Sequence, residues 1–108
     1  KIFSYKKQKI EEKKYTKWFD YDKIKNSPCV RTRRQGDYLT VNSEGGRKKL
    51  NRIFIDEKIP AEMRDRIPVV AAGSEILWIP GGRMNEKYKI TSITGRVLEL
   101  HYQGGALA

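Results

Sequence analysis

The most apolar stretch of the chain, residues 69–79, is divided in its middle by Gly73-Ser74. Each half is too short for a helix, and two short apolar runs joined by a two-residue glycine turn are typical of a β-hairpin. We therefore expect one strand at Val69–Ala72 and a second at 75–79. Whatever the overall fold, we therefore expect it to contain an antiparallel β-sheet.

Other segments indicate further short strands and two helices. Leu50, Ile53 and Phe54 fall at i, i+3 and i+4, which predicts a helix over 47–58, and prolines bracket a second, shorter helix over 61–66. Alternating polar and apolar residues predict strands near 18–24, 30–33 and 38–41, and a second hairpin that joins 88–93 to 96–102 through Thr94-Gly95. The class is α+β, rich in strands, with two short central helices.

The length of 108 residues suits one domain. We expect a basic linker or edge segment at 1–17, the domain itself at 18–103 and a flexible tail at 104–108. The chain does not begin with Met, so a fragment of a longer protein is expected. It has no apolar run of the roughly 18 residues that a membrane helix needs, so it is not expected to be integral to a membrane.

The cysteine and histidine content indicates the redox compartment and limits the metal sites that are possible. A single cysteine, Cys29, cannot form an internal disulfide, which favours the reducing cytoplasm. With one cysteine and one histidine, a zinc site of Cys/His type is excluded and no metal site is expected.

Positive charge is concentrated in the first third of the chain. The formal net charge is +10, and residues 1–34 hold 12 Lys or Arg against 4 Asp or Glu, a net of +8. Such asymmetry points to a polyanionic partner, nucleic acid first and an anionic membrane second. The alternative for 1–17 is a solvated lysine-rich linker.

Catalytic residues are not apparent. His101 lies in an alternating strand and has no obvious nucleophile, the carboxylates are scattered among cations, and no phosphate-loop motif occurs. We expect no catalytic residue in this chain.

Candidate anion-binding residues fall in three places. Arg31 and Arg33 alternate on one strand face, about 6.6 Å apart, where two guanidinium groups suit neighbouring phosphates. The alternative is that each pairs with a nearby carboxylate, such as Asp20, Asp22 or Asp37. Cations at the start of the predicted 47–58 helix are unfavourable there unless an anion binds. The glycines of Pro80-Gly81-Gly82 put an arginine on an exposed loop. The predicted RNA-binding residues are Arg31, Arg33, Arg34, Lys48, Lys49, Arg52 and Arg83.

Five ordered blocks carry a resemblance to a known family. They are 31–37 (RTRRQGD), 46–50 (GRKKL), 54–60 (FIDEKIP), Arg64-Asp65 followed by 68–70 (PVV), and 78–83 (WIPGGR). Together they closely resemble the C-terminal domain of bacterial tRNA(Ile)-lysidine synthetase, from about Phe19 to Tyr102. Gln35 departs from the pattern, which has proline there, and the change affects the stiffness of the turn.

The resemblance implies a function that composition does not show. Enzymes of this family use ATP, with magnesium, to join lysine to the wobble cytidine of a tRNA(Ile) that has a CAU anticodon. That ligase chemistry belongs to an N-terminal catalytic domain, which is the expected partner of this one within the parent chain. The C-terminal domain is expected to be a compact α+β domain with a β-sandwich-like arrangement and to orient the tRNA by its acceptor stem.

Three alternatives remain at this point. The first is a protein-interaction or dimerisation module that supports the parent enzyme, which predicts a homodimer and an exposed apolar patch near 76–79. The second is a free-standing RNA- or ribosome-binding protein. The third, an independent enzyme, needs His101 or a carboxylate pair in a pocket.

Overall fold

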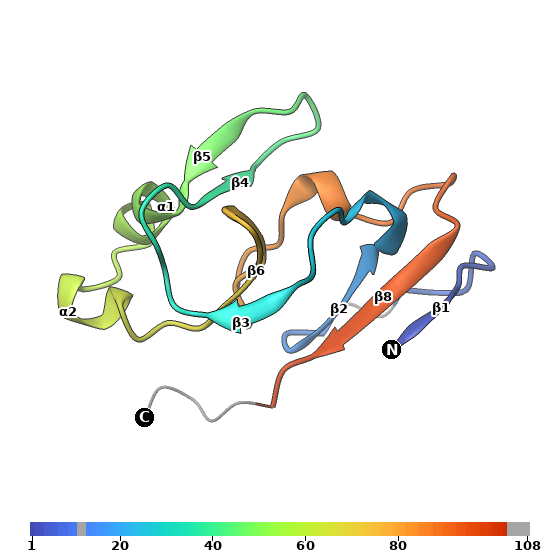
Figure 1. The fold of residues 1–108 in the computed structure, drawn as a ribbon, viewed down its shortest axis with the longest axis horizontal. Helices are drawn as coiled ribbons and strands as arrows, with labels where there is room; N and C mark the ends of the chain where they lie inside the picture. The colour runs from blue at the N-terminus through green and yellow to red at the C-terminus, as the bar shows by residue number, and fades with distance from the viewer. Residues whose placement is uncertain (11–12, 104–108) are drawn as a thin grey trace.

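The computed structural model describes residues 1–10 and 13–103, which form two sheets and two short helices (Figure 1). A three-stranded sheet has the order β1-β8-β2 and a five-stranded sheet has the order β3-β6-β7-β4-β5. The strands are β1 (Ile2–Ser4), β2 (Thr16–Asp20), β3 (Cys29–Arg31), β4 (Tyr38–Thr40), β5 (Arg47–Lys49), β6 (Val69–Ala72), β7 (Glu75–Trp78) and β8 (Arg96–His101). The helices are α1 (Leu50–Asp56) and α2 (Ala61–Arg64), with single 3-10 turns η1 (Tyr21–Lys23) and η2 (Glu86–Tyr88).

The expected hairpin at Gly73-Ser74 is confirmed. Strands β6 and β7 pair antiparallel, and Gly73 has a φ of +66°, a conformation that glycine adopts without strain. All residues of β6 are buried because its side chains point alternately into two hydrophobic cores. The hairpin therefore separates the two halves of the interior.

The first core lies between the five-stranded sheet and α1. Leu50, Ile53 and Phe54 are each 1% exposed and pack with Leu39 of β4 and Val69 of β6. The predicted apolar stripe is thus confirmed as the face that fastens α1 to the sheet.

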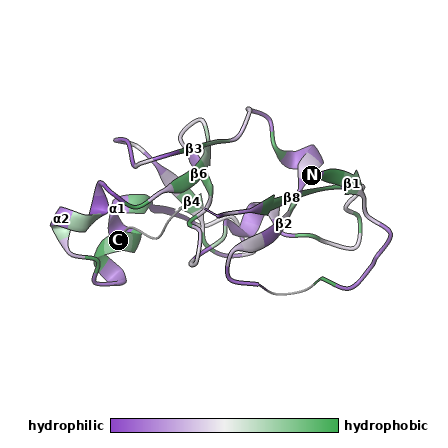
Figure 2. Cartoon of the chain, turned by 90° about the horizontal axis from the view of Figure 1, so that it is seen from below, coloured by the Kyte–Doolittle hydropathy of each residue, from purple (hydrophilic) through white to green (hydrophobic). Residues whose placement is uncertain are grey.

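The second core lies between the two sheets. Phe19 and Leu98 from the three-stranded sheet pack with Val70 and Trp78 from the hairpin, and the rings of Phe19 and Trp78 are 6.1 Å apart. Figure 2 shows hydrophobic colour on β6 and along β8, and hydrophilic colour on many connecting segments. The expected α+β class with two short helices is confirmed.

The predicted helix over 47–58 is wrong at its start. Residues 47–49 form β5, which pairs antiparallel with β4, and α1 begins only at Leu50. The side chain of Asn42 accepts hydrogen bonds from the backbone N–H groups of Glu44 and Gly46, and this turn brings the chain back alongside β4. Local hydrogen bonding therefore overrides the helical period before Leu50.

The second predicted hairpin is also wrong. Strand β8 is present, but it pairs with β1 and β2, and residues 88–93 form no strand. Asn85 explains the difference: its side chain accepts from the backbone N–H of Lys87, which starts η2, and donates to the carbonyl of Ile76. The turn then buries Tyr88 against the second core.

The N-terminal segment contributes to the fold. Strand β1 pairs with β8 at the edge of the three-stranded sheet, and β2 begins at Thr16, so the sheet extends across the expected boundary between 17 and 18. The assignment of 1–17 as a basic linker or edge segment stays a prediction. The tail expected at 104–108 lies outside the described residues.

We predict that Asn85→Ala lowers the free energy of unfolding by about 2 kcal/mol, because it leaves buried backbone groups without partners. Asn42→Ala is the matched control: it removes a similar amide from an exposed turn and is expected to cost about 1 kcal/mol or less. Urea unfolding of both variants measures the difference. Equal losses would show that Asn85 has no special role.

Candidate nucleic-acid interface

An open cavity of about 550 Å³ lies where the loop between β3 and β4 meets α1 and α2. Four cationic side chains line it, against two carboxylates, which gives the lining a net charge of +2. The lining residues are Arg33, Arg34, Gln35, Gly36, Asp37, Lys49, Leu50, Asn51, Arg64 and Asp65. A concentration of cations in an open cavity suits an anionic ligand.

The loop that carries Arg33 and Arg34 is held by an ion pair between Arg31 and Asp37. Nη1 and Nη2 of Arg31 donate to the two carboxylate oxygens, each at 2.8 Å, and Nη2 also donates to the carbonyl of Gly73. The Asp37 side chain is 2% exposed and also accepts the backbone N–H of Arg34 at 2.7 Å. Hydrogen bonding to Asp37 raises the pKa of the Arg31 guanidinium, so Arg31 stays charged.

The expectation of two parallel, free guanidinium groups at Arg31 and Arg33 is wrong. Strand β3 ends at Arg31, and the two side chains find separate partners. For Arg31 the alternative weighed from the sequence, pairing with Asp37, is confirmed. For Arg33 the partner is a carboxylate that the sequence did not suggest, Asp65.

Arg33 and Arg64 are each fixed at the cavity wall by hydrogen bonds from some of their guanidinium N–H groups. Nε of Arg33 donates to Asp65 at 2.7 Å and Nη1 donates to Asn51 at 2.6 Å. Nε of Arg64 donates to the carbonyl of Ile59 at 2.9 Å. Anchoring by these atoms orients both guanidinium groups.

Arg34 and Lys49 differ from their neighbours. Both are exposed, both line the cavity, and neither side chain forms an ion pair or hydrogen bond with any residue that the structure describes. Strand β5 places Lys49 opposite Tyr38, beside the loop. Of the four cations that line the cavity, these two are the most available to an anion.

Lys48 and Arg52 share one carboxylate. Nζ of Lys48 contacts Asp56, and Nε of Arg52 lies 3.2 Å from the same side chain. The hydrogen bond from Lys48 lowers the pKa of the Asp56 carboxyl. The structure thus brings these two predicted residues together in a separate group, outside the lining of the cavity.

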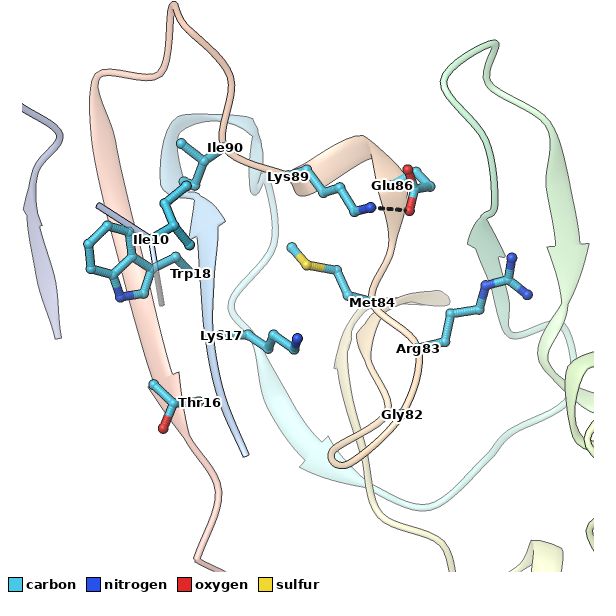
Figure 3. Close-up of a pocket in the computed structure, with 10 residues that line it drawn as sticks. All are labelled: Ile10, Thr16, Lys17, Trp18, Gly82, Arg83, Met84, Glu86, Lys89 and Ile90. Carbon is cyan, nitrogen blue, oxygen red and sulfur yellow. Dashed lines mark ion pairs between the residues drawn. The ribbon is translucent and has the colours of Figure 1, made fainter. Parts of the chain in front are cut away.

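Arg83 is apart from the other predicted residues. It lies on the exposed loop after β7 and lines a different cavity, of about 300 Å³, with Trp18 and Met84 (Figure 3). In that view its guanidinium points away from the Met84 side chain. Trp78, by contrast, is fully buried.

Sequence reasoning missed Arg64 and Asn51 as cavity residues. Arg64 lies in α2 and Asn51 in α1, and the distance along the chain from the arginine loop hides their proximity. The Arg64-Asp65 block of the family resemblance was the only signal that pointed to this segment.

His101 and the carboxylates are the remaining candidates for a catalytic or metal site. His101 pairs with Thr16 through its Nδ1 atom at 2.5 Å from the threonine hydroxyl. Among residues 1–10 and 13–103, no group of three His, Cys, Asp or Glu side chains is arranged to hold a metal ion. Neither helix of this described part is long and apolar enough to cross a membrane.

The fold and the cavity define the class of protein. It is a small α+β domain of two sheets, with arginine and lysine side chains concentrated around a cavity at one end. Known proteins fit this class. The family model described as the TilS substrate C-terminal domain matches residues 29–100. A crystal structure of a TilS C-terminal domain matches with a TM-score of 0.71 and 33% identity, covering 94% of this chain and 82% of that chain.

Curated relatives give the same result. The tRNA(Ile)-lysidine synthase of Caldanaerobacter subterraneus subsp. tengcongensis is 51% identical over 88 residues, which is 82% of this chain and 19% of that protein. That of Clostridium tetani is 41% identical over 90 residues, 83% of this chain and 19% of that protein. The chain therefore belongs to the TilS C-terminal domain family, and it spans about a fifth of the length of these relatives.

We predict that Arg31→Ala destabilises the domain by about 3 kcal/mol, because it leaves the buried Asp37 carboxylate without its cation. Arg34→Ala is the matched control, since this exposed arginine is expected to change stability by about 0.5 kcal/mol or less. Urea unfolding measures both. Similar stabilities for the two variants would contradict the anchoring role of Arg31.

Proposed function

We propose that this domain binds tRNA for a tRNA(Ile)-lysidine synthase and does not itself catalyse the reaction. One observation carries the proposal: Arg34 and Lys49 have no carboxylate partner among the described residues, and they line an open cavity with Arg33 and Arg64. Cations on an exposed surface, without internal partners, are the arrangement that phosphate contacts require.

The cavity is suited to reading shape more than sequence. A-form RNA hides its major groove, and proteins recognise such stems mostly through phosphates and 2′-hydroxyl groups. Arg33 and Arg64 retain donors beyond those used for anchoring, and Arg34 and Lys49 are free to reach outward. We assign the acceptor stem of the tRNA as the part that this surface holds.

The predicted residues take different roles in this proposal. Arg34 and Lys49 contact phosphates first, and Arg33 contacts them from its anchored position. Arg31 acts indirectly, because its donors are used to hold the loop through Asp37. Lys48 and Arg52 form a second contact group whose charge Asp56 partly offsets, and Arg83 is a separate contact.

The parent enzyme is proposed to have the same activity as these relatives, which are tRNA(Ile)-lysidine synthases. In that case a catalytic domain elsewhere in the same protein uses ATP and magnesium to join lysine to the wobble cytidine of a CAU tRNA(Ile), in the cytoplasm. This domain contributes position: phosphate contacts fix the register of the tRNA while the chemistry takes place at a distance.

The dimerisation alternative receives less support. It predicted an exposed apolar patch near 76–79, but Ile76, Leu77 and Trp78 are 0% exposed and Ile79 is 7% exposed. Those residues are part of the two cores and leave no apolar surface at that place.

We predict that the double variant Arg34→Ala, Lys49→Ala binds folded tRNA(Ile) about tenfold more weakly at low salt and that its salt slope falls by about 2. Binding is measured between about 50 and about 200 mM salt. Lys25→Ala, Lys58→Ala is the control with the same net charge, made at exposed residues outside the cavity. If both double variants lose affinity equally, the cavity has no specific role and only the overall charge matters.

We predict that Asp56→Asn strengthens tRNA binding by about threefold, because it releases Lys48 and Arg52 from their shared carboxylate. Stability should change little, since an acidic group at the last residue of α1 is opposed by the helix dipole. Titration of labelled tRNA measures the affinity. Unchanged or weaker binding would remove Lys48 and Arg52 from the RNA-binding surface.

A further inference from the structure

The outer face of the three-stranded sheet carries an aromatic pair. Trp18 of β2 is opposite Glu99 of β8, and Phe3 of β1 is opposite Val97, so the two aromatic residues flank β8 on one face. The other face carries Phe19 and Leu98, which belong to the second core. The aromatic pair is therefore on the side of the sheet that faces away from that core.

The pair has a defined geometry. The ring centroids of Phe3 and Trp18 are 4.9 Å apart with an interplanar angle of 74°, an edge-to-face contact. The indole N–H of Trp18 donates to the Glu99 carboxylate at 2.7 Å, which fixes the orientation of the ring. Both aromatic side chains are only partly buried.

A cavity of about 540 Å³ opens onto this pair, and lysines border it. It is lined by Lys1, Phe3, Ser4, Lys6, Gln8, Trp18 and Glu99. Nζ of Lys1 is 5.5 Å from the Phe3 ring centroid, and the backbone N–H of Lys6 donates to the side chain of Gln8 at 2.6 Å. Residues 1–10 contain Lys1, Lys6, Lys7 and Lys9 and no Asp or Glu.

We infer that this cavity binds an unpaired nucleotide of RNA, with its base on the Phe3–Trp18 pair and its phosphates near Lys1 and Lys6. The inference rests on the proposed function, that the domain binds tRNA, and adds a second site to it. Proteins that hold single-stranded RNA combine a positive groove with exposed aromatic rings on which bases stack. A base inside a duplex is already stacked, so such a site selects an unpaired one.

The site is distinct from the cationic cavity near α1 and α2. Figure 1 shows β1 and α2 at opposite ends of the longest dimension of the molecule, which is 43 Å. An RNA that reaches both sites must therefore extend along the whole domain, as a stem with a single-stranded extension does.

The test compares a blunt RNA hairpin with the same hairpin carrying a short single-stranded 3′ extension. Phe3→Leu is expected to weaken binding of the extended hairpin about tenfold, which is about 1.4 kcal/mol, and to leave binding of the blunt hairpin unchanged. Tyr15→Leu is the matched control, because Tyr15 is an aromatic residue, 44% exposed, that does not line the cavity. Lys6→Ala should reduce the salt slope by about 1 for the extended hairpin alone.

Tryptophan fluorescence supplies a second measurement that needs no destabilising change. Trp18 is partly exposed and Trp78 is 0% exposed, so quenching by the extended hairpin should occur in the unmodified domain and vanish in Trp18→Phe. One result overturns this inference and leaves the proposed function standing: the blunt hairpin binds through Arg34 and Lys49, and the single-stranded extension neither raises the affinity nor quenches the tryptophan fluorescence. Failure to bind either hairpin overturns both.

Discussion

The ion pair between Arg31 and Asp37 is the contact on which the cationic end of the domain depends. It connects the arginine loop to the β6–β7 turn through the carbonyl of Gly73. The backbone carbonyl of Asp37 also accepts the N–H of Leu50 at 2.9 Å, where α1 begins. Removing two charges from water is costly, so a nearly buried pair adds little net stability and is better understood as a device that fixes position. The loop, the turn and the helix meet at this one pair.

The distribution of carboxylates decides which cations are available. Asp37 holds Arg31, Asp65 holds Arg33, and Asp56 is shared by Lys48 and Arg52. A phosphate that approaches these groups competes with a carboxylate already in contact with them. The formal net charge of +10 therefore overstates the positive charge that is available to an RNA. The cations without a carboxylate partner in the described structure contribute more to RNA binding than their number suggests.

Several features could be predicted from the sequence because they depend on neighbours along the chain. The glycine turn at 73 sets the β6–β7 hairpin, and the spacing of Leu50, Ile53 and Phe54 marks the buried face of α1. Features that depend on distant residues could not be predicted in this way. Arg33 and Asp65 are 32 residues apart, and no local pattern shows that they meet.

The two wrong elements have the same cause. Residues 47–49 have no strong strand pattern of their own, yet pairing with β4 makes them a strand. Residues 88–93 do alternate, yet the buried side chain of Asn85 starts a tight turn there instead. In both places hydrogen bonds made by a neighbouring turn or strand outweigh a weak local preference: the Asn42 turn and β4 for residues 47–49, and the Asn85 side chain for residues 88–93.

This arrangement also explains how an exposed arginine can be part of a precise interface. A free arginine side chain loses about 2 kcal/mol of rotamer freedom when a phosphate orders it, and a mobile loop would lose backbone freedom as well. The backbone of Arg34 is already held, because its N–H donates to Asp37. Only the side chain then remains to be ordered by the RNA. The buried pair thus transfers the cost of ordering the loop from the binding step to the folding of the domain.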